Sequence, residues 1–294
     1  VFSTIKLGNN LFVGSNNGLF FSSDNGEHWQ KRNEGIIGEI RALMSFDDLL
    51  FAASYGFWNY RTSDNGMTWV KLQNGITNNT TTCFARLNND ILIGTYGGGL
   101  FKSSNLGDFW TNIPVNSSAR YITCLGTIDE NIIIGTYQNG IYRSTDSGNN
   151  WTLSNSGLYG AFNYVRDLLT YNNNLYIATD GGVFLSSNYG ESWIAINQGL
   201  EGTLIKSLAV YQNKLFASGW YNGDVFISLD NGLNWKPIKI GMPNDAEIYS
   251  IDAFDNRLFA SSLNHGLYCI DIPEIIVDVN DENSQNLNFS LEQN

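Results

Sequence analysis

A short motif that ends in tryptophan recurs six times along the chain at an almost constant interval. Each copy reads Ser or Thr, any residue, Asp or Asn, any residue, Gly, two residues and Trp, and the copies occupy 22–29, 62–69, 103–110, 144–151, 186–193 and 228–235. The tryptophans are 40, 41, 41, 42 and 42 residues apart. Such a period indicates one repeated supersecondary unit. We therefore expect an array, not the two domains that a length of 294 residues would otherwise suggest.

Each period contains four short apolar segments separated by turn residues. In the second period these segments lie in 41–48, 49–55, 56–64 and 67–73. Short aliphatic and aromatic runs between Asp, Asn and Gly are typical of strands joined by hairpins. Four strands in about 41 residues leave no room for a helix, so the predicted fold is an all-β propeller of four-stranded antiparallel blades.

A second marker predicts the number of blades. A glycine followed closely by an aromatic residue opens the expected third strand seven times, at Gly18, Gly56, Gly99, Gly140, Gly182, Gly223 and Gly266. The seventh unit has expected strands at 248–254, 258–262 and 267–270 but lacks the tryptophan motif. We therefore predict seven blades, the last one incomplete, in a propeller domain at 1–273. Its missing strand would come from 274–279 or from upstream of Val1, because propellers close by pairing the ends of the chain.

The motif resembles the Asp-box, or BNR, repeat of sialidases, sortilin-type receptors, xyloglucanase-like glycosidases and the photosystem II assembly factor family. In that family the box is a structural turn, and Asn105 and Asn188 depart from its aspartate. The resemblance implies that the boxes lie on one face of the propeller. It also implies that the connections after the second and fourth strands surround the channel mouth on the opposite face, where ligands bind.

Composition excludes several classes of partner. The net charge of −12 would repel a phosphate backbone, so we expect no nucleic-acid partner. No apolar run approaches the roughly 20 residues that span a bilayer. Three cysteines give no disulfide framework, and we expect Cys83 and Cys124 to be small buried side chains at equivalent positions. We expect a monomer without a cofactor or a metal ion.

The last 21 residues, 274–294, form an acidic, Asn-rich tail that breaks the repeat. Its end, Phe289–Asn294, resembles the start of the C-terminal sorting domain used in type IX secretion. That resemblance implies a protein that is secreted or displayed on the cell surface. No signal peptide is present, so we expect Val1 to begin a mature or trimmed chain.

Aligned positions predict a ligand-binding face at the channel mouth. The position after the second strand is aromatic in four repeats, and the position near the start of the first strand is cationic in three. The first position reads Asn16, Tyr55, Tyr96, Tyr137, Asp180, Trp220 and Leu263, and the second reads Phe2, Arg41, Thr82, Thr123, Arg166, Lys206 and Tyr249. The connections before the first strands add Arg120, Tyr159, Phe162 and Tyr164. The predicted ligand-binding residues are Tyr55, Trp58, Tyr96, Tyr137, Asp180, Trp220, Arg41, Arg166 and Lys206.

Aromatic rings with a few charges suit a glycan or an extracellular protein, because sugars stack on flat rings and interfaces use Tyr, Trp and Arg as anchors. Two alternatives remain open. The rings could simply cover the blade ends in a structural surface module. The chain could also be a glycoside hydrolase or lyase that uses two carboxylates. Its candidate carboxylates are Glu39, Asp180, Glu201, Asp224, Asp245 and Glu247.

Other enzyme chemistry finds little support in the sequence. The two histidines, His28 and His265, lie far apart in the repeat, and no G-x-S-x-G elbow, zinc-ligand cluster or phosphate-binding loop is present. No R-I-P motif or assignable Tyr–Glu pair of a sialidase is found either. We therefore expect a binding module with no catalytic residues.

Overall fold

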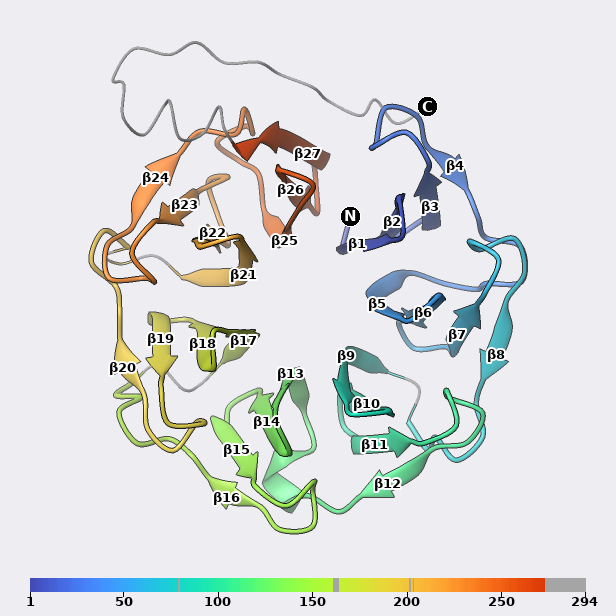
Figure 1. Cartoon of the computed structure of the whole chain (residues 1–294), viewed down its shortest axis with the longest axis horizontal. Coiled ribbons are helices and arrows are strands. Elements are labelled where there is room, and N and C mark those ends of the chain that lie inside the picture. Colours follow the sequence, from blue (N-terminus) through green and yellow to red (C-terminus); the bar gives the residue numbers. More distant parts are fainter. Residues whose placement is uncertain (79, 161–163, 201, 203, 273–294) are drawn as a thin grey trace.

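The computed structural model describes residues 1–78, 80–160, 164–200, 202 and 204–272. Seven antiparallel sheets stand around a central axis like the blades of a propeller (Figure 1), which confirms the predicted fold and blade number. Six sheets have four strands in sequential order from the centre outward, and the seventh has three. The tail expected at 274–294, including the closing strand at 274–279, lies outside the described residues.

The first strands of the blades surround the axis, and the second strands pair with them. The first strands are β1 (Ser3–Leu7), β5 (Ile40–Phe46), β9 (Thr81–Leu87), β13 (Ile122–Ile128), β17 (Val165–Tyr171), β21 (Ile205–Tyr211) and β25 (Ile248–Phe254). The second strands are β2 (Asn10–Ser15), β6 (Leu49–Ser54), β10 (Asp90–Thr95), β14 (Asn131–Thr136), β18 (Asn174–Thr179), β22 (Lys214–Gly219) and β26 (Arg257–Ser262).

The third and fourth strands form the outer half of each blade. The third strands are β3 (Gly18–Ser22), β7 (Asn59–Thr62), β11 (Gly99–Ser103), β15 (Ile141–Ser144), β19 (Gly182–Ser186), β23 (Val225–Ser228) and β27 (Gly266–Asp271). The fourth strands are β4 (Gln30–Lys31), β8 (Val70–Leu72), β12 (Thr111–Ile113), β16 (Thr152–Leu153), β20 (Ile194–Ala195) and β24 (Lys236–Ile238). The predicted strand starts at Gly56, Gly140 and Gly223 are wrong by one to three residues, because the third strands begin at Asn59, Ile141 and Val225 and these glycines belong to the preceding turns.

The tryptophan motif forms the turn between the third and fourth strands. In the first copy, Ser22 Oγ donates to Asp24 Oδ1 (2.7 Å) and accepts from the Gly26 amide (2.8 Å), while Asp24 Oδ1 also accepts from the His28 amide (3.0 Å). The other five copies repeat all three bonds. Asn105 and Asn188 accept through the same oxygen, so asparagine fulfils this part of the turn.

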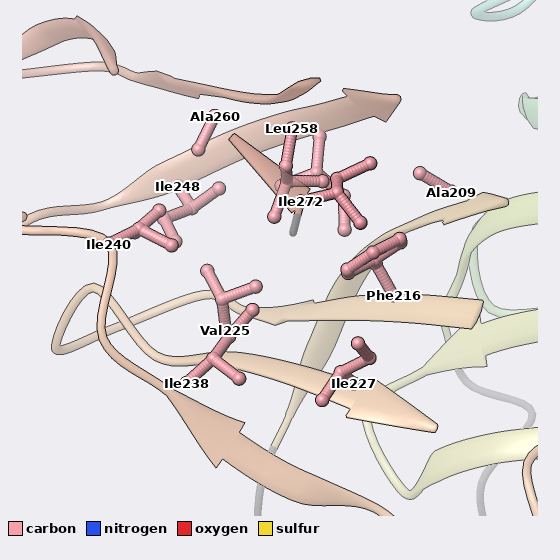
Figure 2. Packing of buried hydrophobic residues seen from close by; sticks show 11 residues of the cluster. Ala209, Phe216, Val225, Ile227, Ile238, Ile240, Ile248, Leu258, Ala260 and Ile272 are labelled. Atoms are coloured by element: carbon pink, nitrogen blue, oxygen red, sulfur yellow. The ribbon is translucent and has the colours of Figure 1, made fainter. Parts of the chain in front are cut away.

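Apolar side chains fill the spaces between neighbouring blades. Between blades 6 and 7 the cluster includes Phe216, Val225 and Ile227 from one blade and Ile248 and Leu258 from the other, as Figure 2 shows. The motif tryptophans extend such clusters outward. Trp193 of blade 5 is 2% exposed, packs against the blade 4 to 5 cluster and donates its indole N–H to Ser154 O of blade 4.

Blades 7 and 1 close the ring through side chains and the amino terminus. The Val1 ammonium donates to Ser262 O (2.9 Å), Lys6 pairs with Asp255, and Arg257 donates to Asn25 O (2.8 Å). Between them lies a cluster that includes Leu11, Val13, Phe259 and Leu267. Within the described part of the chain, no helix has the length and apolar character to span a membrane.

Candidate functional site at the channel mouth

A β-bulge near the start of six first strands sets the geometry of the channel mouth. In blades 2 to 7 the pairing of the first and second strands skips one residue, and the unpaired residues are Arg41, Thr82, Thr123, Arg166, Lys206 and Tyr249. A bulge leaves its extra residue outside the ladder and redirects its side chain. We call these six residues the bulge ring. They occupy the aligned position that the sequence identified as cationic in three repeats.

The residue after each second strand is fixed by the preceding connection. The amides of Tyr55, Tyr96, Tyr137 and Trp220 donate to the carbonyls of Glu39, Thr80, Tyr121 and Leu204. In all four blades the acceptor is a backbone carbonyl, so the bond does not depend on the side chain of the acceptor residue. Because the backbone is held in the same way in these blades, the side chains rise at equivalent places around the mouth.

Bulge-ring and aromatic side chains enclose a cavity of about 310 Å³, which we call the mouth cavity. It is lined by Arg41, Tyr55, Thr81, Thr82, Tyr96, Thr123, Tyr164, Arg166, Lys206 and Tyr249. Five of the nine predicted ligand-binding residues are among them. Tyr137, Asp180 and Trp220 adjoin this set. Tyr137 lies 6.3 Å from Tyr96 and 4.8 Å from Tyr164 between ring centroids, and the other two contact Arg166.

Trp58 occupies a different place. Its ring lies 3.7 Å from Lys71 Nζ of β8, on the outermost strand of blade 2, and it does not line the mouth cavity. Five lining residues were not in the predicted set: the aromatic Tyr164 and Tyr249, and Thr81, Thr82 and Thr123. Tyr249 could have been included, because it shares the aligned position of Arg41, whereas Tyr164 depends on how the connection before β17 is placed.

Each arginine of the bulge ring is stacked between aromatic rings. The Arg41 guanidinium lies 3.7 Å from the Tyr55 ring centroid and 5.0 Å from that of Phe2. The Arg166 guanidinium lies 4.2 Å from the Tyr164 centroid and 4.5 Å from that of Trp220. Stacking of this kind holds a guanidinium plane by cation–π attraction and leaves its N–H edge free to bond in the plane.

Carboxylates occupy part of these edges. Glu39 accepts from Arg41 Nε (3.0 Å) and Nη2 (2.8 Å), and Asp180 accepts from Arg166 Nε (2.6 Å). Both Nη groups of Arg166 remain without a hydrogen-bond partner among the described residues. Two free N–H groups on one planar edge suit a carboxylate or sulfate of a ligand.

Lys206 completes the cationic group. Its Nζ lies 4.3 Å from the Tyr249 centroid and 5.3 Å from that of Trp220. Burial lowers the pKa of Lys206 to about 8, and the charges of Arg166 and Arg41 act in the same direction, while Asp167 opposes them. The three cations are therefore close enough to repel one another, and an anion among them would relieve that repulsion.

A second cavity of about 310 Å³ lies in the channel and shares all six bulge-ring residues with the mouth cavity. We call it the channel cavity. It is lined in addition by Asp167, Asp252, Ser3 and Ser207, and by Cys83 and Cys124. Burial raises the pKa of Cys83 to about 12 and that of Cys124 well above its ordinary value, so both thiols stay protonated at neutral pH. Both cysteines are at equivalent positions, as expected.

The candidate catalytic carboxylates are largely engaged elsewhere. Glu39 and Asp180 are the counterions of Arg41 and Arg166, and Asp245 pairs with His265 (2.9 Å). Burial raises the pKa of Asp224, and its carboxylate does not line either cavity. Glu201 lies outside the described residues. Glu247 is not among the described residues that line either cavity.

A possible metal-ligand group lies on the opposite face. Asp24, Glu27 and His28 of the first motif have ligand atoms within 4.8 Å of one another and are exposed. His28 Nδ1 is already 2.7 Å from Asp24 Oδ2, and Asp24 Oδ1 belongs to the turn. These contacts explain the group as part of a hydrogen-bonded turn.

Comparison with known proteins agrees with the fold. A family model described as the DUF6242 beta propeller domain matches residues 135–245. No curated protein matches the chain.

Several solved structures are similar. The extracellular domain of BT4673 from B. thetaiotaomicron, described as part of a hybrid two component system, has a TM-score of 0.74 and 17% identity, over 91% of this chain and 37% of that one. YCF48 from Cyanidioschyzon merolae has a TM-score of 0.74 and 16% identity, over 93% and 95%. The GH74 enzyme of Niastella koreensis has a TM-score of 0.67 and 16% identity, over 92% and 42%.

These similarities define the class of protein: a seven-bladed β-propeller, of the fold found in binding modules and in GH74 enzymes. At such identities the likeness shows the fold alone. The chain spans less than half of the BT4673 domain and of the GH74 enzyme. Function must be argued from the site, because propellers support many unrelated activities.

Proposed function

We propose that this chain is a binding module that recognises an acidic glycan, or an extracellular protein that carries acidic groups, at the mouth cavity. The observation that carries the proposal is the convergence of Arg41, Arg166 and Lys206 with a surround of tyrosines on one cavity of about 310 Å³. This volume is at the lower end of the range for ligand pockets.

Different side chains of the mouth cavity would contact different parts of the ligand. Tyr55 and Tyr96 are 41% and 39% exposed, so each offers part of a ring for stacking against a sugar or an apolar side chain. The free Nη groups of Arg166 would bind a carboxylate or sulfate of the ligand in bidentate fashion. The aromatic stacking already restrains both guanidinium groups, which reduces the entropy lost on binding.

Charge supports an acidic ligand. The chain carries a net charge of −12, yet three of its 16 basic residues gather in the bulge ring. Bringing like charges together in a partly buried place costs free energy unless an opposite charge completes the site. Glu39 and Asp180 supply two negative charges, and the ligand would supply the next.

Export is part of the proposal, supported by the resemblance of Phe289–Asn294 to a secretion signal and by the extracellular placement of the similar BT4673 domain. We propose a monomer. The engagement of Glu39 and Asp180 as counterions favours binding over glycoside hydrolysis, because each carboxylate already accepts from an arginine of the mouth cavity.

The experiment is an array of oligouronates, sulfated oligosaccharides, matched neutral oligosaccharides and acidic peptides, probed with the wild type and three variants. We expect an acidic probe to bind, and Arg166→Gln to weaken it about tenfold or more through lost charge-assisted bonds. The double variant Tyr96→Ala, Trp220→Ala should weaken binding as well. Tyr189→Ala, on the opposite face, should leave it unchanged.

Two outcomes would contradict the proposal. One is preferential binding of neutral probes that does not respond to Arg166→Gln. The other is equal loss of binding in Tyr189→Ala, which would place the contact surface on the face of the tryptophan motifs.

A further inference from the structure

The channel cavity differs in charge from the mouth cavity above it. The two cavities share the six residues of the bulge ring, so they form one continuous space. The described residues that line the mouth cavity include three cations and no carboxylate, whereas the channel cavity adds the carboxylates of Asp167 and Asp252. Carboxylates therefore enter the described lining only in the channel, below the three cations.

The carboxylates at the two levels have different partners. At the mouth, Glu39 and Asp180 each form an ion pair with an arginine. In the channel, neither Asp167 nor Asp252 forms an ion pair within the described ranges. Asp167 accepts from Ser207 Oγ (2.9 Å) and from the Leu208 amide (2.8 Å). Its negative charge also favours the protonated form of Lys206 and so opposes the lowering of that residue's pKa.

Asp252 is the less compensated of the two. Among the described residues, a backbone hydrogen bond from Thr4 is the one interaction that favours its charged form, while burial and the charge of Asp167 oppose it and raise its pKa to about 7. Ser3, which also lines the channel cavity, has a buried hydroxyl oxygen without a partner in the described part of the chain. A hydrogen-bond donor that carries a positive charge is what this end of the cavity lacks.

Strand register gives the distance between the two levels. Tyr249 belongs to the bulge ring, and Asp252 follows it by three residues on β25. At about 3.3 Å per residue, Asp252 lies roughly 10 Å along the strand from the level of the ring. Asp167 follows the ring by one residue on β17, so it lies between the cations and Asp252.

The donor set favours an ammonium group over a metal ion. A calcium ion needs six to eight oxygen ligands, and a preformed cage brings several carboxylates together. Asp167 and Asp252 belong to no group of three metal-ligating side chains among the described residues. An ammonium group needs only one carboxylate and one or two neutral acceptors, such as hydroxyl oxygens, for its three N–H donors.

We propose that the channel cavity is a subsite for a protonated amine, so that the ligand carries an acidic group held by the bulge ring and an amino group that reaches Asp252. The inference rests on the proposed function, since it assigns the acidic group to the same arginines. It narrows the ligand to an amino-bearing acid, such as a glycan with free amino and carboxylate groups or a peptide segment with both charges.

The test uses three probes of equal chain length with the intact protein: 6-aminohexanoate, hexanoate and hexylamine, each titrated by ligand-observed NMR. We expect the wild type to bind 6-aminohexanoate about tenfold or more tightly than hexanoate, because the second charged contact adds to the first. Asp252→Asn should remove this difference and leave hexanoate binding unchanged. Arg166→Gln should weaken both acids and leave hexylamine unchanged.

The outcomes separate the inference from the proposed function. Equal affinity for hexanoate and 6-aminohexanoate overturns the amine subsite and leaves the anion site standing. Binding of hexylamine that depends on Asp252, without binding of hexanoate, supports the subsite and overturns the anion site. Binding of none of the probes overturns both. A calcium titration that displaces the amine through Asp252 shows a metal site instead and also overturns the inference.

Discussion

The two ends of each blade use polar residues in opposite ways. At one end, the tryptophan motif directs its Ser and Asp side chains at the backbone of the same turn, with three hydrogen bonds that recur in six blades. At the other end, Arg41, Arg166 and Lys206 project from bulges into a shared cavity. The polar groups of the motif end stabilise the fold, and the cations of the mouth end line a cavity.

The pKa values follow the same division. Hydrogen bonds from the backbone and side chains of the turn lower the pKa of Asp24 and Asp64 to about 2. Burial raises the pKa of Asp252 to about 7 and lowers that of Lys206 to about 8. The charged forms of Asp24 and Asp64 are thus favoured at the motif end, whereas those of Asp252 and Lys206 are disfavoured in the channel. Groups whose charge is uncompensated in the folded protein are the ones that a ligand can compensate.

The largest effect is expected at the motif end. Trp193→Ala should lower the free energy of unfolding by about 3–5 kcal/mol, because it empties a buried site between blades 4 and 5 and removes the bond to Ser154 O. Chemical denaturation measures this loss. Tyr96→Ala, at the exposed mouth, is the matched control and should cost less than about 1 kcal/mol. Similar costs for both variants would remove the contrast between the two ends.

The second prediction concerns the channel. Asp252→Asn should raise the free energy of unfolding at pH 8 by about 2–4 kcal/mol, since it removes a carboxylate whose pKa rises from 3.8 to about 7 on folding. The folded state holds the proton more tightly, so the wild type should lose stability as pH rises from 4 to 7, while the variant should not. Denaturation curves at pH 4 and pH 8 test the sign. A variant that is less stable at pH 8 would show that Asp252 is already compensated.

The smallest effect is expected within the motif turn. Asp64→Ala should cost about 1–2 kcal/mol, because the Thr62 hydroxyl and the Thr68 amide lose their acceptor. Asp64→Asn should cost less than Asp64→Ala, because Asn105 and Asn188 accept the same hydrogen bonds at their positions, but it should lose the contribution of the charge. Since the pKa of Asp64 is lowered to about 2, the contribution of its charge is present above pH 3.8 and disappears as pH falls towards 2. Thermal unfolding at pH 7 and pH 2 measures it, and a larger cost at pH 2 would refute this account.

Much of the fold could be predicted because the repeat makes local residues decisive. Turn formation by Ser22, Asp24 and Gly26 depends on neighbours within eight residues, and six copies set the number of turns. The predicted start of the third strand is wrong at Gly56 and Gly223, because the turn continues past each glycine and the strands begin at Asn59 and Val225. Periodicity fixes how many units exist, whereas the end of each turn depends on its own residues.

The site could be predicted only in part. Arg41 and Arg166 were found because one aligned position recurs in every repeat, and the bulge at that position explains why. Trp58 was expected at the mouth from its place in the connection, but the structure packs it against Lys71. The place of a residue in the sequence of a loop does not determine the direction in which its side chain points. Tyr164 reaches the cavity only because the connection before β17 brings it beside Tyr137.

The sequence alone therefore determined the seven sheets, their order and the ring of aligned positions, since each depends on a period and on turns between near neighbours. Only the tertiary structure decided that Asp167 and Asp252, 85 residues apart in the chain, share one cavity beneath Arg166 and Lys206. The reason is physical: closing the ring brings distant strands to a common axis, and burial there changes the charge state of groups that would be ordinary on an open surface.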